Sequence, residues 1–212
     1  MKWTISGSSN LDQILAFLAE GRQIYALESH DNGTYHLAQT DAWQPGLHTL
    51  GEYRQTEPLK ALFFPAREFI GRWGETGGRE PMPERIVFGV KNCDLSSLAI
   101  FDHVFLHGVD KDTYYAEARD KTILVSSDCS SQLEVCFCPA VGEQPHAREG
   151  FDINIAETPD GYLIESGSER GKSLLESAEQ FLEPASDALI ETLEEQRSSR
   201  YAELVEQGKA HG

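Results

Sequence analysis

Two short, uninterrupted apolar runs in the middle of the chain constrain the fold more than any other feature. Residues 85–90 read Arg-Ile-Val-Phe-Gly-Val, and residues 121–125 read Lys-Thr-Ile-Leu-Val. Such runs are typical of strands buried on both faces of a parallel sheet. The segment between them, residues 94–106, has apolar residues at helical spacing. We therefore expect a β-α-β unit at the centre of the molecule.

One hairpin is expected on each side of this unit, the first over residues 23–38 and the second over residues 151–165. In the first, Asp31-Asn-Gly separates two runs that suit strands, and this tripeptide is a strong signal for a tight turn. In the second, a segment with alternating apolar residues leads into a Pro-Asp-Gly turn that ends at Gly161.

Helical patterns occupy much of the remaining chain. A capped amphipathic helix is expected from Ser9 or Asn10 until Gly21. Residues 59–73 have helical spacing, but Pro65 interrupts it, so a short strand before that proline is equally compatible. Residues 171–207 are acidic and mostly helix-forming, with a break at Pro184.

These patterns predict an α/β protein of mixed type. Its central, partly parallel sheet would carry hairpins at the periphery and helices on its flanks. With 212 residues, the chain is long enough to bury a substantial core. We expect an α/β domain over residues 1–173, which includes the N-terminal helix and hairpin, and an acidic helical extension over residues 174–212.

Charge and hydropathy exclude several classes of partner. The net charge of −17 argues against nucleic acid and anionic membranes, because both attract positive surfaces. No apolar run approaches the length of a membrane span, so no direct membrane insertion is expected. The first ten residues lack the apolar stretch of a secretory signal. A cytoplasmic location is the resulting expectation, and clustered cysteines there more often bind metal than form disulfides.

The chain has four cysteines: Cys93, Cys129, Cys136 and Cys138. Cys93 follows the first apolar run and Cys129 follows the second, and ligands of parallel sheets gather beyond the carboxyl ends of the strands. Cys136 and Cys138 lie on the chain that leaves the second strand. If the two strands are neighbours, all four thiols can serve one site.

Four interpretations of this cysteine pattern compete. An iron–sulfur cluster suits four thiolates on loops, and Pro139 directly after Cys138 resembles the proline that follows a cluster cysteine in bacterial ferredoxins. Structural zinc favours paired cysteines with two to four residues between them, and no such pair occurs here. A reactive dithiol at Cys136 and Cys138 is the third interpretation, and four buried cysteines that only pack are the fourth.

A composite motif resembles one protein family. Its pieces occur in order: Cys93-Asp-Leu before a helix, Asp112-Thr-Tyr-Tyr, a single cysteine at 129, Cys136-Phe-Cys and Gly150-Phe-Asp. The chain resembles the iron–sulfur β subunit of cytoplasmic hydrogenases (sulfhydrogenases) and the A subunit of anaerobic sulfite reductase. The resemblance extends over roughly residues 55–180.

The resemblance implies an electron-transfer subunit with no independent catalysis. It implies one cluster, [4Fe-4S], with Cys93, Cys129, Cys136 and Cys138 as ligands. Asp94 would replace one thiolate or support the site, while its ordinary role would be the N-cap of the helix. The implied partners are a catalytic subunit and a ferredoxin-like or flavin-containing subunit.

The chain departs from the family pattern in one respect. Such subunits usually continue into a ferredoxin-like domain with two further runs of cluster cysteines, and no cysteine follows Cys138 here. We expect that this module either lies on a separate polypeptide or has been lost. Two other functions stay open: a zinc-stabilised assembly subunit, and a thiol–disulfide oxidoreductase that uses Cys136 and Cys138.

Overall fold

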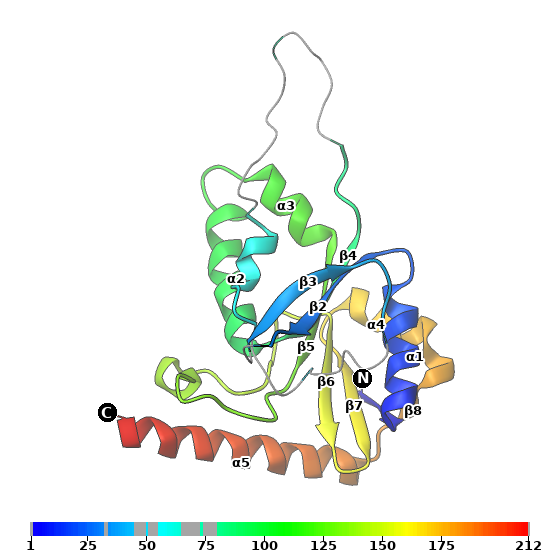
Figure 1. Ribbon diagram of the computed structural model, residues 1–212, viewed down its shortest axis with the longest axis vertical. Coiled ribbons are helices and arrows are strands. Elements are labelled where there is room, and N and C mark those ends of the chain that lie inside the picture. Colours follow the sequence, from blue (N-terminus) through cyan, green and yellow to red (C-terminus); the bar gives the residue numbers. More distant parts are fainter. Residues whose placement is uncertain are drawn as a thin grey trace.

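The computed structural model describes residues 2–31, 34–44, 50, 55–64, 73 and 80–211. Within these residues the chain forms one mixed sheet of eight strands in the order β3-β2-β4-β5-β6-β7-β1-β8 (Figure 1). The strands are β1 (Lys2–Ser6), β2 (Gln23–Ser29), β3 (Tyr35–Thr40), β4 (Arg85–Val90), β5 (Thr122–Ser127), β6 (Ile153–Thr158), β7 (Gly161–Ser166) and β8 (Glu183–Pro184). The helices are α1 (Ser8–Ala19), α2 (Asn92–Phe105), α3 (Thr113–Asp120), α4 (Glu169–Ser177) and α5 (Asp187–His211). Three short 3-10 segments are η1 (Leu59–Leu62), η2 (Cys138–Val141) and η3 (Glu179–Phe181).

The centre of the sheet is parallel, as the two apolar runs predict. Strands β2, β4, β5 and β6 run in the same direction, and β4 pairs directly with β5. Every residue of β4 and β5 is buried. Their side chains alternate between two cores, so that Ile86 packs in one and Val87 in the other. The mixed α/β class with a partly parallel sheet is therefore confirmed.

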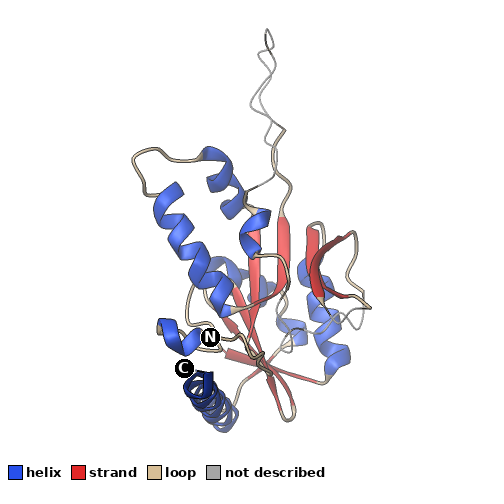
Figure 2. Ribbon diagram, turned by 60° about the vertical axis from the view of Figure 1, so that its left-hand side comes forward, coloured by secondary structure: helices blue, strands red, loops and turns tan. Residues whose placement is uncertain are grey.

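Helices cover both faces of this sheet (Figure 2). Leu11 and Ile14 of α1 and Leu175 of α4 belong to the first core, while Leu98 of α2 and Tyr115 of α3 belong to the second. The long helix α5 lies at the end of the molecule where β6 and β7 turn (Figure 1). Its Leu193 packs with Ala156 and Leu163 of those two strands.

Both expected hairpins form. Strand β2 pairs antiparallel with β3, and β6 pairs antiparallel with β7. Asn32 and Gly33 of the first turn lie outside the described residues. Helix α1 begins at Ser8, one or two residues before the expected cap, and ends before Gly21.

The region from residue 59 to residue 73 forms neither of its two expected elements within its described part. Leu59–Leu62 is the 3-10 segment η1, held by hydrogen bonds such as that from the Phe63 N–H to the Lys60 carbonyl, 2.9 Å. Residues 65–72 lie outside the described residues.

The break at Pro184 is confirmed in the C-terminal region. Pro184 lies in β8, which pairs antiparallel with β1 at the edge of the sheet, and α5 begins three residues later. An edge position tolerates proline because its missing N–H faces no neighbouring strand. In the part of the chain that is described, no helix combines the length and the apolar character needed to cross a membrane.

Candidate cysteine site

The four cysteines lie beyond the carboxyl ends of β4 and β5. Cys93 lies in the first turn of α2, not in a linker before the helix, and Cys129 follows β5 by two residues. Cys136 lies in the following loop, and Cys138 begins η2. All four side chains are half-buried, and none forms a disulfide. Because β4 and β5 are parallel neighbours, Cys93 and Cys129 leave the sheet at the same edge.

Lys91 is a buried cation near both of these cysteines. Only 2% of it is exposed, and its ammonium group donates a hydrogen bond of 2.8 Å to the Ser127 hydroxyl. Burial lowers the pKa of Lys91, while the nearby negative groups, led by Cys129 and Asp128 and followed by Cys93, oppose that decrease. The sequence analysis missed Lys91, although a lysine that ends an apolar strand directly before a cysteine motif is an available signal.

The thiols of Cys129, Cys136 and Cys138 interact electrostatically. Burial raises the pKa of Cys129; the charge of Lys91 opposes this increase, and Cys136 adds to it. Burial also raises the pKa of Cys138, and the thiols of Cys129 and Cys136 raise it further. Proximity to Lys91 links Cys93 to the same group. Nevertheless, among the described residues no three Cys, His, Asp or Glu side chains are close enough to hold a single metal ion.

Backbone hydrogen bonds fix the loop that carries Cys136 and Cys138. The Cys136 N–H donates to the Leu133 carbonyl at 3.0 Å, and the Leu133 N–H donates to the Cys136 sulfur at 3.3 Å. At the other end, the Glu143 N–H donates to the Cys138 carbonyl at 2.8 Å. These contacts give the two thiols defined positions.

Asp94 is the third residue of α2 and not its N-cap. Because Asn92 and Cys93 are already helical, the N-cap position belongs to Lys91. The Lys91 side chain makes no capping hydrogen bond. The predicted capping role is therefore wrong. The Asp94 carboxylate is buried and accepts a hydrogen bond of 3.1 Å from the Gln55 amide. Its role toward a metal stays a prediction.

Helix α5 is attached to the loop through a buried arginine. The Arg197 guanidinium contacts the carboxylates of Asp128 and Glu165 at 2.7 Å each, and that of Glu194 at 3.0 Å. Burial would lower the pKa of Arg197, but hydrogen bonds and charges from Asp128 and Glu165 raise it above its usual range. Arginine 197 was not singled out from the sequence, where one arginine among many charges gives no such signal.

Two further α5 contacts reach the same loop. The Arg200 guanidinium donates to the Gln132 side-chain oxygen at 3.3 Å, and the Gln207 amide donates to the Leu133 carbonyl at 2.8 Å. Helix α5 therefore braces the cysteine loop along three turns.

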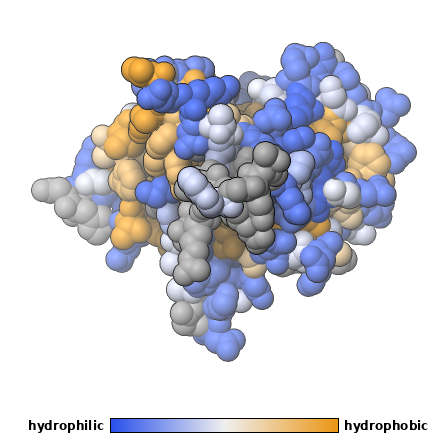
Figure 3. All heavy atoms as spheres, turned by 90° about the horizontal axis from the view of Figure 1, so that it is seen from above, coloured by the Kyte–Doolittle hydropathy of each residue, from blue (hydrophilic) through white to orange (hydrophobic). Residues whose placement is uncertain are grey.

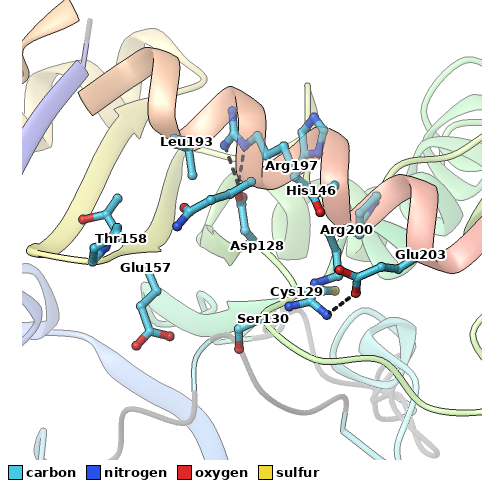
Figure 4. Close-up of a pocket in the computed structure, with 14 residues that line it drawn as sticks. Asp128, Cys129, Ser130, His146, Glu157, Thr158, Leu193, Arg197, Arg200 and Glu203 are labelled. Carbon is cyan, nitrogen blue, oxygen red and sulfur yellow. Dashed lines mark hydrogen bonds and ion pairs between the residues drawn. The ribbon is translucent and has the colours of Figure 1, made fainter. Parts of the chain in front are cut away.

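A polar pocket of about 410 Å³ adjoins Cys129, between the loop, the β6–β7 turn and α5 (Figure 4). Three buried polar atoms of its wall have no hydrogen-bond partner among the described residues: Ser130 Oγ, His146 Nδ1 and Thr158 Oγ1. Burial, and then the charge of Arg197, lowers the pKa of His146. A pocket of this size admits water, which satisfies such atoms in most proteins.

Comparison with known proteins identifies one curated relative, sulfhydrogenase 2 subunit beta of Pyrococcus furiosus, which is 31% identical over 156 residues. This similarity supports a hydrogenase β-subunit-like family. The aligned part covers 73% of this chain and 45% of the relative, so the match spans less than half of that protein. No family model matches the chain, and no solved structure matches it.

The family assignment confirms the resemblance that the composite motif predicts. The cysteine motifs of this hydrogenase β-subunit-like chain lie at one edge of its sheet, where β4 and β5 end.

Proposed function

We propose that this protein is an electron-transfer subunit of a hydrogenase-type complex and binds one iron–sulfur cluster, [4Fe-4S], through Cys93, Cys129, Cys136 and Cys138. The observation that supports this most is that Cys93 and Cys129 follow the ends of the paired strands β4 and β5. Cys136 and Cys138 lie near enough to Cys129 to interact with it electrostatically. The printed name of the relative, a subunit of a sulfhydrogenase, supports the same kind of complex.

The four side chains fit a cluster in kind. Thiolates are the usual ligands of [4Fe-4S] clusters. In such a cluster each iron takes one protein thiolate, so the sulfurs lie farther apart than ligands that share one ion. The chain also lacks the cysteine pairs, with two to four residues between them, that structural zinc sites favour.

The surrounding residues would prepare this edge for a negatively charged group. Cys93 lies in the first turn of α2, where the backbone N–H groups carry partial positive charge. The buried ammonium of Lys91 adds a nearby cation. A bound cluster would accept and release one electron at a time, and the chain would supply its insulation, position and electrostatic environment.

The partners would be other subunits of one complex. We propose a catalytic subunit on one side and a ferredoxin-like or flavin-containing subunit on the other, in the cytoplasm. In this arrangement the protein carries electrons and has no substrate of its own.

Metal analysis of anaerobically purified protein tests the proposal. We expect a brown protein with about four iron atoms and about four acid-labile sulfides per chain. Cys138→Ser should lose at least half of the iron. Ala140→Ser is the matched control, because it adds the same hydroxyl in the same loop and removes no thiol.

Other outcomes contradict the proposal. Colourless protein with one zinc per chain would indicate a zinc-stabilised assembly subunit. Metal-free protein with a reversible disulfide between Cys136 and Cys138 would indicate a thiol–disulfide oxidoreductase.

A further inference from the structure

The cysteine loop presents an unusual number of apolar side chains to solvent. Leu133, Val135, Phe137 and Val141 are 45%, 73%, 52% and 61% exposed. We call these four residues the apolar loop face. They are half of the eight large hydrophobic residues that are exposed in the described part of the chain, and they fall within nine positions. Gathered apolar side chains on a surface mark sites of interaction.

The exposure follows from how the loop is attached. The Leu133 carbonyl accepts from the Gln207 amide of α5, and its N–H donates to the Cys136 sulfur. Residues 138–141 form η2, which Gly142 closes with a positive φ of 79°. Because the loop backbone is bonded toward the protein, its apolar side chains remain on the outer side.

The loop that carries this face is acidic. Between residues 128 and 143 the sequence contains Asp128, Glu134 and Glu143, but no lysine and no arginine. The exposed Glu134 lies between Leu133 and Val135 of the face itself. The whole chain carries a net charge of −17. A surface of this kind favours partners with complementary positive charge and disfavours anionic membranes.

We infer that the apolar loop face is the docking surface for a redox protein whose contact region has an apolar centre bordered by lysine and arginine. This inference rests on the proposed function, since Cys136 and Cys138 lie within the face. A partner bound there would approach the cysteine site directly. A second copy of this chain would instead bring like charges together at the same place.

Electron transfer to a probe of this chemistry tests the inference. The protein is first reduced with dithionite and freed of excess reductant. It is then mixed in a stopped-flow instrument with a lysine-rich ferric c-type cytochrome. One electron leaves the reduced protein and converts ferric to ferrous haem, so haem absorbance gives the second-order rate constant. An acidic cytochrome and the small acceptor ferricyanide are measured in parallel.

Two variants carry the prediction. Val135→Ser/Phe137→Ser should reduce the basic cytochrome at least about tenfold more slowly and should reduce ferricyanide at the unchanged rate. Glu134→Lys should slow the reaction with the basic cytochrome and accelerate that with the acidic one, with both effects decreasing at high salt.

The matched control is Ile100→Ser/Val104→Ser. These residues are 68% and 51% exposed on α2. Figure 3 shows hydrophobic residues on one side of the molecule in the view from above. This control should react like the wild-type protein. Iron and sulfide contents are measured for every variant, so that a loss of the cluster is not mistaken for a loss of docking.

The failures of the two proposals can be distinguished. Wild-type protein without iron and sulfide contradicts the proposed function and the docking inference together. Protein with its full cluster, in which Val135→Ser/Phe137→Ser reacts as fast as wild type, contradicts only the docking inference. A dimer in light scattering that becomes monomeric in this variant would assign the face to a second copy and overturn the inference.

Discussion

Removal of the buried arginine of α5 should destabilise the protein far more than removal of an exposed one on the same helix. The proposed change is Arg197→Met, which keeps much of the apolar stem and deletes the charge. The Arg197 side chain is 7% exposed, and its partners Asp128 and Glu165 are 13% and 14% exposed. Among the described residues, loss of the guanidinium would leave Asp128 only the Asn154 amide at 2.9 Å, and Glu165 only that amide at 3.2 Å and the Lys2 ammonium at 3.5 Å.

The expected magnitude follows from this burial. Breaking a buried ion pair by deleting one partner costs about 3–5 kcal/mol. The control Arg200→Met removes an ion pair with Glu203 whose side chains are 31% and 50% exposed, together with the 3.3 Å hydrogen bond to Gln132. Exposed pairs of this kind contribute about 0.2–1 kcal/mol. The two variants should therefore differ severalfold in the free energy of unfolding.

Urea unfolding of both variants, followed by circular dichroism, measures this difference. Equal losses in Arg197→Met and Arg200→Met would refute the assignment of Arg197 as the anchor of α5. Iron content adds a second readout, because Asp128 precedes Cys129 directly and a detached α5 should weaken cluster retention.

The stability difference should also depend on pH with a definite sign. Burial alone would raise the pKa of Glu165, but hydrogen bonding and charge from Arg197 lower it below its ordinary value of 4.5. A carboxylate whose pKa is lower in the folded protein than in the unfolded chain stabilises the fold. This contribution is complete above the unfolded pKa and is lost as the pH falls through the folded pKa. The gap between wild type and Arg197→Met should therefore narrow on acidification below pH 4.5.

Three further changes are tested by thermal unfolding. Gly171→Ala would place a methyl group 1.8 Å from the Asp152 carbonyl oxygen, so we expect a loss of roughly 1–3 kcal/mol. Gly208→Ala on α5, where no described atom lies within 4 Å, should instead stabilise by about 0.5–1 kcal/mol. Tyr115→Phe deletes the 2.7 Å hydrogen bond to Asp102 and should cost about 1–2 kcal/mol; an unchanged melting temperature would contradict that bond.

Local patterns were sufficient for the centre of the fold. Residues 85–90 became β4 with identical bounds, because a strand buried on both faces must be apolar throughout. The Pro-Asp-Gly turn likewise predicted the pairing of β6 with β7. The shared location of Cys93 and Cys129 followed from the pairing of β4 with β5, which are consecutive strands along the chain.

Long-range pairing was not predictable in the same way. Arg197 contacts Asp128, 69 positions earlier, and Glu165, 32 positions earlier. A charged residue in an acidic helix carries no local signal that identifies such partners. The cap role of Asp94 was wrong because α2 starts earlier than its apolar periodicity indicates. The division at residue 173 and the metal-binding role of the cysteines stay predictions.

The position of β1 has a consequence for biosynthesis. Lys2–Ser6 pairs with Gly161–Ser166 on one side and with Glu183–Pro184 on the other. The first strand to leave the ribosome therefore waits for its neighbours while about 160 residues are made, roughly 8–30 s at the usual rates of synthesis. During that interval β1 has neither of its partner strands, β7 and β8. The sheet can therefore be completed only after most of the chain has been translated.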